Sequence, residues 1–174
     1  MKEVILMGKG SLAIKIAKWF NQSSDYKLKL IIPVIPEPSW TDSLISWSKQ
    51  NNIEYIKSGN YLDIPENNNE NYKIDLVFSV FYDKIIKDFF IKKCDKILNL
   101  HNAYLPKYRG VSPINWALKN NENTHGITIH EISPGIDDGR IISQISYSIY
   151  PDFDEVRDVY IRSLEYGWTL FNQT

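Results

Sequence analysis

The 174-residue sequence has a single cysteine, Cys94, and no long hydrophobic run. One cysteine excludes an intrachain disulfide and a metal cluster held by cysteines. A membrane helix requires roughly 18 consecutive apolar residues, and no stretch of this chain approaches that length. The apolar run in MKEVILMGKG at the start is also too short for a signal peptide. We therefore expect a cytoplasmic protein without a membrane partner.

An excess of positive charge is also missing. The 20 lysine and arginine residues are balanced by 21 aspartate and glutamate residues, which gives a formal net charge of -1. Because binding to DNA or tRNA requires many contacts between basic side chains and phosphates, we expect no nucleic-acid partner. A small phosphate-binding pocket is compatible with this balance. The spacing of the His, Asp and Glu residues does not suggest a metal site, so no metal is expected.

The order of the apolar segments indicates an α/β protein. Short apolar runs predict strands at residues 3–8, 27–35, 74–80 and 96–100, a weak strand at 52–58, and two later strands at 125–132 and 139–150. Amphipathic segments predict helices at residues 9–20, from a cap at Thr41 or Asp42 onward, at 82–93 and at 154–171. In the last helix the residues expected to face inward are Val156, Val159, Leu164 and Trp168. Strands that alternate with helices predict a mostly parallel sheet in a single domain spanning residues 1–174.

In sheets of this kind, ligands bind beyond the carboxyl ends of the strands. Three segments should share that rim: residues 8–11, residues 79–83, and the segment from His101 onward. The first carries the pattern G-x-G-x-x-A, whose backbone amides can bind a phosphate with help from Lys9, Gly10 and Ser11. The alternative is a tight turn without a ligand. The acidic residue that would bind a ribose after the second strand is missing, so we do not expect a dinucleotide.

Asn99 and His101 lie at the end of the strand predicted at residues 96–100. Residues two apart in an extended segment point to the same side, so these side chains can converge on one point. An amide N–H and an imidazole placed together can stabilise an oxyanion and relay a proton. The alternative is an ordinary loop histidine whose partners are backbone groups.

A later turn, SPGIDDGR at residues 133–140, carries two aspartates. A carboxylate beside an imidazole raises its basicity and fixes its orientation. The alternative is an ordinary hairpin, because Asp and Gly are common turn residues. We interpret His125 and His130, which lie in or beside a strand, as structural residues. Ser79 and Ser112 lack the strand–turn–helix setting of a nucleophilic serine.

Taken together, NLHNAYLPKYRGVSPINWAL and HGITIHEISPGIDDGRII resemble the folate-dependent formyltransferase family. That family includes the enzymes that formylate methionyl-tRNA, glycinamide ribonucleotide and nucleotide-linked amino sugars. Its hallmark is Asn-x-His at the end of a strand, then Leu-Pro, and an Asp in a later Leu/Ile-Asp-x-Gly turn. The resemblance implies that Asn99, His101 and Asp137 are catalytic. It also implies a Rossmann-like formyltransferase catalytic domain, with a mostly parallel twisted sheet and helices on both faces.

The resemblance implies N10-formyltetrahydrofolate as co-substrate and no metal. Its pterin should lie against the segments 79–86 and 134–138. The candidate cofactor-binding residues are Ser79, Phe81, Tyr82, Ile85, Ile86, Pro134 and Asp138. An amine would attack the formyl carbon, Asn99 and protonated His101 would donate hydrogen bonds to the oxyanion, and Asp137 would hold the imidazolium and help to move the proton.

Within the family, the run from Arg109 to Leu118 resembles the tRNA and amino-sugar enzymes more than the glycinamide ribonucleotide enzyme. The small, weakly acidic chain, without the basic second domain of the tRNA enzyme, resembles the enzymes that act on a nucleotide-linked amino sugar. The specific expectation is dTDP-4-amino-4,6-dideoxyglucose, for the synthesis of O-antigen or another surface polysaccharide. The candidate acceptor-binding residues are Lys9, Gly10, Ser11, Lys84, Tyr104, Tyr108 and Arg109. Methionyl-tRNA formylation, or a catalytically weak module that binds folate or a nucleotide sugar, are the alternatives.

Two features depart from the family pattern. Arg140 stands where relatives often have a small residue or proline after Asp-Asp-Gly. The sequence stops at Thr174, whereas relatives usually continue with a segment used for dimerisation or acceptor binding. We therefore expect that this C-terminal extension is absent; a homodimer remains open.

Overall fold

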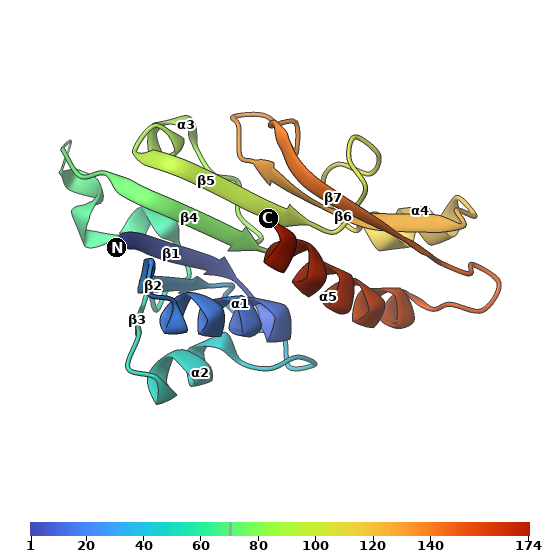
Figure 1. Ribbon diagram of the computed structural model, residues 1–174, viewed down its shortest axis with the longest axis horizontal. Helices are drawn as coiled ribbons and strands as arrows, with labels where there is room; N and C mark the ends of the chain where they lie inside the picture. The colour runs from blue at the N-terminus through green and yellow to red at the C-terminus, as the bar shows by residue number, and fades with distance from the viewer. Residues whose placement is uncertain (70) are drawn as a thin grey trace. The chain divides into compact units, whose positions relative to one another are not determined.

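The apolar runs of the N-terminal half form strands of a parallel sheet. The computed structural model describes residues 1–69 and 71–174, and the chain divides into two compact units, residues 1–98 and 99–174 (Figure 1). The strands of the first unit are β1 (Lys2–Gly8), β2 (Tyr26–Pro33), β3 (Glu54–Tyr55), β4 (Ile74–Val80) and the start of β5 (Cys94–His101). Their order is β3-β2-β1-β4-β5.

The central strand of the first unit is β1. It pairs in parallel with β2 and with β4, so that Val4 lies beside Leu28 and Leu76. Consecutive residues of β1 from Val4 onward are buried, which is typical of a parallel strand covered on both faces. The weak strand predicted at residues 52–58 is confirmed only at β3, which pairs with β2. The prediction of an α/β fold with a mostly parallel sheet is confirmed.

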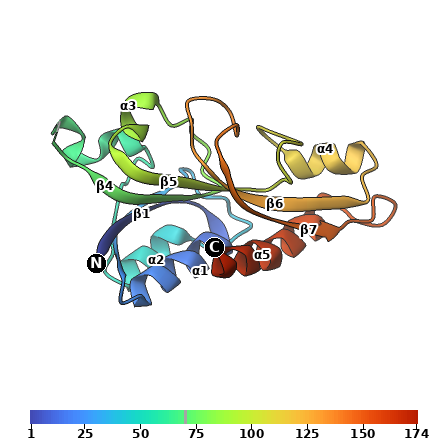
Figure 2. The ribbon, with the colours of Figure 1, turned by 45° about the horizontal axis from the view of Figure 1, so that its top comes forward.

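Helices cover both faces of these strands. The helices are α1 (Gly10–Gln22), α2 (Leu44–Gln50) and α3 (Asp88–Ile91). Leu12, Ile16 and Phe20 recur at helical spacing and bury the face of α1 that packs on β1 and β2. Figure 2 shows α1 and α2 on one side of these strands and α3 on the other. The cap of α2 is Ser43 rather than Thr41 or Asp42, since its side chain accepts a hydrogen bond from the Ser46 N–H.

The helix predicted at residues 82–93 is much shorter than expected. The Tyr61 hydroxyl donates to the Ile85 carbonyl and accepts from the Lys87 N–H, at 3.2 and 3.0 Å. These bonds occupy backbone groups that a helix would need, and Phe81 has a positive φ of 58°. The polar segment predicted as a loop at 63–73 contains one short 3-10 turn, η2 (Pro65–Asn68), and another, η1 (Tyr61–Asp63), ends at its first residue. Residue 70 lies outside the described residues.

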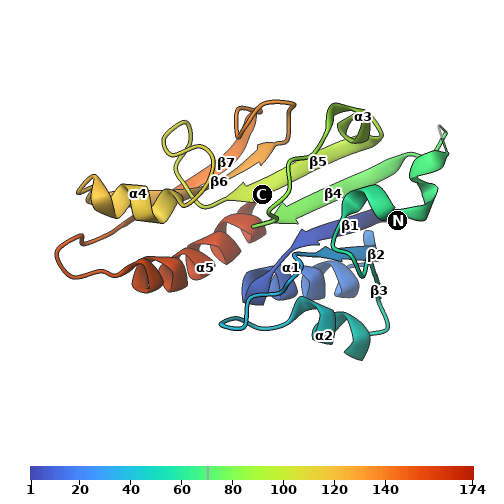
Figure 3. The ribbon, with the colours of Figure 1, turned by 180° about the vertical axis from the view of Figure 1, so that it is seen from behind.

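The second unit contains the last residues of β5 and an antiparallel hairpin. Its further elements are α4 (Pro113–Lys119), β6 (Thr124–Glu131), β7 (Ile141–Ser148) and α5 (Val156–Gln173). β6 pairs antiparallel with β7, with Thr124 opposite Ser148 and Ile129 opposite Ser143. α5 packs on β6 and β7 and also contacts α4, as the view from behind shows (Figure 3).

The face that α5 buries differs from the predicted one. Val159 is buried as expected, but Val156 is 40% exposed, and Ser163, Gly167 and Leu170 are buried. Small side chains at 163 and 167 allow the helix to approach the hairpin closely. On the same helix, the ring of Tyr166 stacks on Tyr147 of β7 with centroids 4.7 Å apart.

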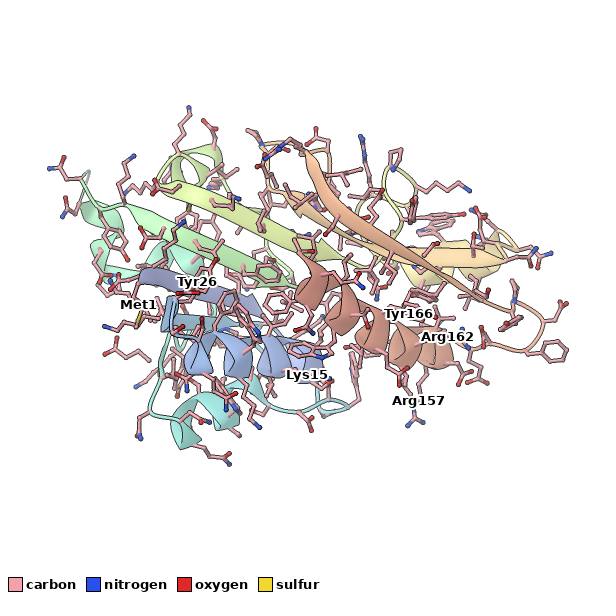
Figure 4. All side chains as sticks on the ribbon, viewed as in Figure 1. Met1, Lys15, Tyr26, Arg157, Arg162 and Tyr166 are labelled. Atoms are coloured by element: carbon pink, nitrogen blue, oxygen red, sulfur yellow. The ribbon has the colours of Figure 1, made fainter. Side chains whose placement is uncertain are left out.

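The start of α5 is fixed by charged side chains. Glu155 and Asp158 form a reciprocal capping box. Arg162, labelled in Figure 4, forms two hydrogen bonds with the Asp154 carboxylate, at 2.7 and 3.0 Å. A planar guanidinium facing a carboxylate is a strong ion pair. In the described ranges, 1–69 and 71–174, no helix has the length and apolarity needed to cross a membrane.

Candidate active site

The second unit gathers the predicted catalytic residues around the Asp137 carboxylate. The Asp137 Oδ2 lies 3.5 Å from His101 Nδ1 and accepts a hydrogen bond from the Gly110 N–H at 2.8 Å. Its Oδ1 lies 3.4 Å from His130 Nε2. Each carboxylate oxygen therefore faces one imidazole. Asp137 has a positive φ of 47°, a conformation that Asp tolerates better than most residues.

The turn that carries Asp137 is tightly specified. A Cβ at Gly139 would lie 1.8 Å from the Glu131 carbonyl oxygen, so only glycine fits. The Ser133 hydroxyl donates to the Asp138 carboxylate across the turn. Arg140 pairs with Glu131 at 2.6 Å, and the Glu131 N–H donates to the Arg140 carbonyl. The departure from the family pattern at Arg140 therefore adds an ion pair that joins the two ends of the turn.

His130 belongs to this cluster, although the sequence led us to interpret it as structural. The Asn99 side-chain amide lies 3.2 Å from His130 Nε2. His130 thus touches both Asn99 and Asp137. It stands at the end of β6, three residues before the turn. The argument that selected His101, a histidine at the end of a strand, could also have selected His130.

Backbone carbonyls define the tautomers of the two histidines. His101 Nε2 lies 2.9 Å from the Tyr108 carbonyl, and His130 Nδ1 lies 2.8 Å from the Glu131 carbonyl. A carbonyl only accepts, so both of these nitrogens carry a hydrogen. In neutral His130 the other nitrogen accepts from the Asn99 amide. In neutral His101 the Nδ1 lone pair faces Asp137, whereas protonation would turn that contact into a hydrogen bond.

Burial opposes the charge on His101. Its side chain is 8% exposed, and burial lowers the pKa of His101 below its usual value, although Asp137 and the Tyr108 carbonyl act to raise it and His130 to lower it. At neutral pH the resting imidazole is therefore mostly neutral, whereas a protonated ring is expected in the reaction. Burial of Asp137 acts to raise its pKa, but His130, His101 and the Gly110 N–H together lower the pKa below its ordinary value. Asp137 is therefore ionised.

The residue that follows His101 is held from two elements. The Asn102 side-chain amide donates to the Ser163 hydroxyl of α5 at 3.0 Å. His125 Nε2 donates to the Asn102 carbonyl at 2.8 Å. This contact agrees with the interpretation of His125 as a structural residue. The backbone that carries the His101 imidazole is therefore fixed by α5 and β6.

In the first unit, packing explains part of the G-x-G-x-x-A turn. A Cβ at Gly8 would lie 2.0 Å from the Val80 carbonyl oxygen, and the Lys9 N–H donates to that same oxygen. Gly10 has a positive φ of 79° and begins α1, and Ser11 is half-buried. The first glycine is thus required by its contact with β4, whether or not a phosphate binds.

The candidate cofactor residues of the first unit differ in exposure. Ser79 and Ile86 are buried, whereas Ile85 is 74% exposed. The Tyr82 hydroxyl donates to the Gly59 carbonyl at 2.6 Å, and burial raises the pKa of Tyr82. Lys84, a candidate for the acceptor, pairs with the neighbouring Asp83 at 3.4 Å.

The candidate binding residues of the second unit also differ in exposure and in their contacts. Tyr104, Arg109 and Pro134 are exposed. The Tyr108 hydroxyl, in contrast, donates to Glu122 at 2.8 Å. Among the residues that the structure describes, no group of three or more His, Cys, Asp or Glu side chains is arranged to hold a metal ion.

A comparison with protein families identifies the relationship. The family model described as "Formyl transferase" matches residues 37–173, which is most of the chain. The chain belongs to the formyl transferase family. The resemblance expected from the Asn-x-His and Asp-containing segments is therefore confirmed, and both segments lie within the matched residues.

Solved structures and a curated relative support this membership. One solved structure is that of WlaRD, a sugar 3N-formyl transferase in the presence of dTDP and 5-N-formyl-THF. It is 31% identical to this chain with a TM-score of 0.82, and the alignment covers 99% of this chain and 61% of the WlaRD chain. The N-formyltransferase from Helicobacter canadensis, in complex with folinic acid and dTDP-3-aminofucose, is 30% identical with a TM-score of 0.81, over 99% of this chain and 62% of its own.

The bifunctional polymyxin resistance protein ArnA from Wigglesworthia glossinidia brevipalpis is 40% identical over 104 residues, which are 59% of this chain and 16% of that protein. The chain therefore spans less than two thirds of the length of each of these three relatives.

Proposed function

We propose that this chain is the catalytic part of an N-formyltransferase, which transfers the formyl group of N10-formyltetrahydrofolate to the amine of a nucleotide-linked amino sugar. The observation that carries the proposal is the contact of His101 with Asp137, in the cluster that also contains Asn99 and His130. Support for the substrates comes from two relatives, whose structures contain a formylated folate together with dTDP or a dTDP-linked amino sugar.

Both segments that the resemblance assigns to the pterin carry an exposed apolar side chain. The turn that carries Asp137 also exposes Ile136, which is 59% accessible, and in the first unit Ile85 is exposed as well. Apolar side chains at the surface offer packing area to a flat aromatic ring. Pterin binding at segment 134–138, and that at segment 79–86, stay predictions for each segment by itself. In segment 79–86, buried Ser79 and Ile86 would contribute by shaping the backbone.

Asn99 and His101 supply the hydrogen-bond donors. Bound N10-formyltetrahydrofolate provides an activated formyl carbon, which the neutral amine attacks, so that negative charge develops on the formyl oxygen. Asn99 uses one N–H toward His130 and retains a second. The Nε2–H of His101 points at a neutral carbonyl, and an oxyanion is the stronger acceptor, because charge-assisted hydrogen bonds are about twice as strong as neutral ones.

Proton transfer follows from the electrostatics of His101. The ring is mostly neutral at rest, because burial lowers its pKa. Negative charge that develops beside it raises its proton affinity, and Asp137 can then accept a hydrogen bond from the protonated Nδ1. The Nδ1 of His101, which carries no hydrogen in the neutral ring, can therefore hold the proton that the amine loses. When the tetrahedral intermediate collapses, the bond between the formyl carbon and N10 breaks and N10 receives a proton. Asp137 orients the ring and stabilises its charge.

For the acceptor, we propose a dTDP-linked amino dideoxysugar, with dTDP-4-amino-4,6-dideoxyglucose as the first compound to test. A product of this kind would serve a surface polysaccharide such as O-antigen. Lys9, Gly10, Ser11, Lys84 and Arg109 are the proposed phosphate donors, and Tyr104 offers an exposed ring. A relative holds a 3-amino sugar, so the amino position must be tested directly. Dimerisation and a cytoplasmic location stay predictions.

The test is an incubation of the protein with N10-formyltetrahydrofolate and a panel of acceptors, followed by mass spectrometry. The panel contains dTDP-4-amino-4,6-dideoxyglucose, dTDP-3-aminofucose, a UDP-linked amino sugar and methionyl-tRNA. We expect a formyl group on a dTDP-linked sugar, and loss of that product in His101→Ala. Formylation of methionyl-tRNA alone, or of no acceptor while folate still binds, would refute the proposal.

A further inference from the structure

The loop between His101 and α4 touches both members of the His101–Asp137 pair. The Tyr108 carbonyl accepts a hydrogen bond from His101 Nε2 at 2.9 Å. Two residues later, the Gly110 N–H donates to Asp137 Oδ2 at 2.8 Å. The position of this loop therefore sets the orientation of the imidazole and of the carboxylate together.

The side chain of Tyr108 holds the loop from its other side. Its hydroxyl donates to Glu122 Oε1 at 2.8 Å and accepts from the Asn120 side-chain amide at 3.0 Å. Lys107 pairs with the same Glu122 carboxylate at 3.1 Å. The hydrogen bond from Tyr108, followed by that from Lys107, lowers the pKa of Glu122, so the acceptor is ionised. Charged acceptors form the stronger hydrogen bonds.

The backbone of Tyr108 needs this support. Its φ is 57°, in the left-handed region that residues other than glycine rarely adopt. Such a conformation persists where surrounding contacts hold it. In this conformation the phenol reaches Glu122 while the carbonyl faces His101. The phenol oxygen already has a donor and an acceptor, which leaves little of its capacity for a sugar nucleotide.

We propose that Tyr108 is a positioning residue: Glu122 and Asn120 hold its phenol, and its carbonyl thereby fixes the orientation and tautomer of His101. This role replaces the acceptor contact expected for Tyr108 from the sequence. The inference rests on the proposed function insofar as it predicts turnover. Its geometric part concerns His101 alone and can be measured without any substrate.

The experiment compares Tyr108→Phe, Glu122→Ala and Glu122→Gln with a control, Tyr150→Phe, which removes the hydroxyl of an exposed tyrosine in the same unit. Nitrogen chemical shifts of the imidazoles report the tautomer of His101. Steady-state kinetics give kcat and KM for each substrate. Glu122→Gln retains a carbonyl acceptor for the phenol and should rescue much of what Glu122→Ala loses.

We expect Tyr108→Phe and Glu122→Ala to lower kcat about tenfold, the effect of losing one hydrogen bond to a charged group, with KM nearly unchanged. The His101 signals should shift toward a mixture of tautomers in both variants and stay unchanged in Tyr150→Phe. The double variant should lose no more than either single one, since both break the same link.

Three outcomes would overturn the inference. Unchanged His101 signals in Tyr108→Phe and Glu122→Ala would remove its geometric basis. A raised KM for the acceptor with unchanged kcat would indicate that Tyr108 contacts the acceptor, as the sequence led us to expect. Strictly additive losses in the double variant would show that the two residues act separately. If the unmodified protein transfers no formyl group, the proposed function fails, while the chemical shifts still decide the role of Tyr108.

Discussion

Replacement of Asp137 by asparagine tests the electrostatic part of the proposed mechanism. The substitution keeps the shape of the side chain and retains an oxygen to accept from the Gly110 N–H, so the turn should stay folded. It removes the negative charge 3.5 Å from His101 Nδ1. At an effective dielectric constant of about 20, Coulomb's law gives about 4–5 kcal/mol for an imidazolium and a carboxylate at that separation.

This attraction exists only while His101 carries a proton, which is expected during the reaction. The substitution should therefore raise the activation barrier and leave substrate binding nearly unchanged. We expect kcat to fall about 1,000-fold, with KM nearly unchanged. Because Asp137 raises the pKa of His101 against the effect of burial, the variant should also show a lower pKa for this histidine by NMR titration.

The matched control is Asp152→Asn, which neutralises an exposed carboxylate in the same unit. A kcat for Asp137→Asn within tenfold of the unmodified protein would refute the reasoning, and so would a His101 pKa that rises or stays constant. Loss of folding, checked by circular dichroism, would instead show that Asp137 is needed to stabilise the folded protein.

Three further predictions follow from other contacts. Asn99→Ala removes a proposed oxyanion donor and should lower kcat about 100- to 1,000-fold, measured by single-turnover formyl transfer; a loss below tenfold would contradict that role. Gly139→Ala places a Cβ against the Glu131 carbonyl oxygen and should lower the free energy of unfolding by about 1–3 kcal/mol in urea, whereas an unchanged midpoint would mean that the turn can shift. The hydrogen bonds from Arg162 lower the pKa of Asp154, so this stabilisation is complete above the unfolded pKa of about 3.9 and disappears as the pH falls through the lower folded value. Arg162→Met should therefore weaken the loss of stability in acid, and an acid limb identical to that of the unmodified protein would disprove the assignment.

Local patterns in the sequence were sufficient for most strands and for the turn that carries Asp137, whereas its pairing with His101 was expected from the family resemblance. Buried parallel strands read as continuous apolar runs, so β1 and β4 could be recognised directly. The turn around Asp137 could be recognised by its glycines. These features depend on neighbours in the chain.

Contacts between distant residues explain what the sequence did not reveal. The helix predicted from residue 82 is interrupted by the Tyr61 hydroxyl, which lies more than twenty positions away. The inward face of α5 follows from the fit of Ser163 and Gly167 against a hairpin. His130 joins the site through its partners, Asn99 and Asp137, and no periodicity of β6 indicates which of its residues has such partners.

The shared carboxylate between two imidazoles has a consequence for pH–rate measurements. One oxygen of Asp137 faces His101 and the other faces His130. Asp137 acts to raise the pKa of His101, and His130 acts to lower it. Any bell-shaped rate profile will therefore report macroscopic constants of a three-membered cluster. Assigning a limb of that profile to one residue will require a site-specific probe on each histidine.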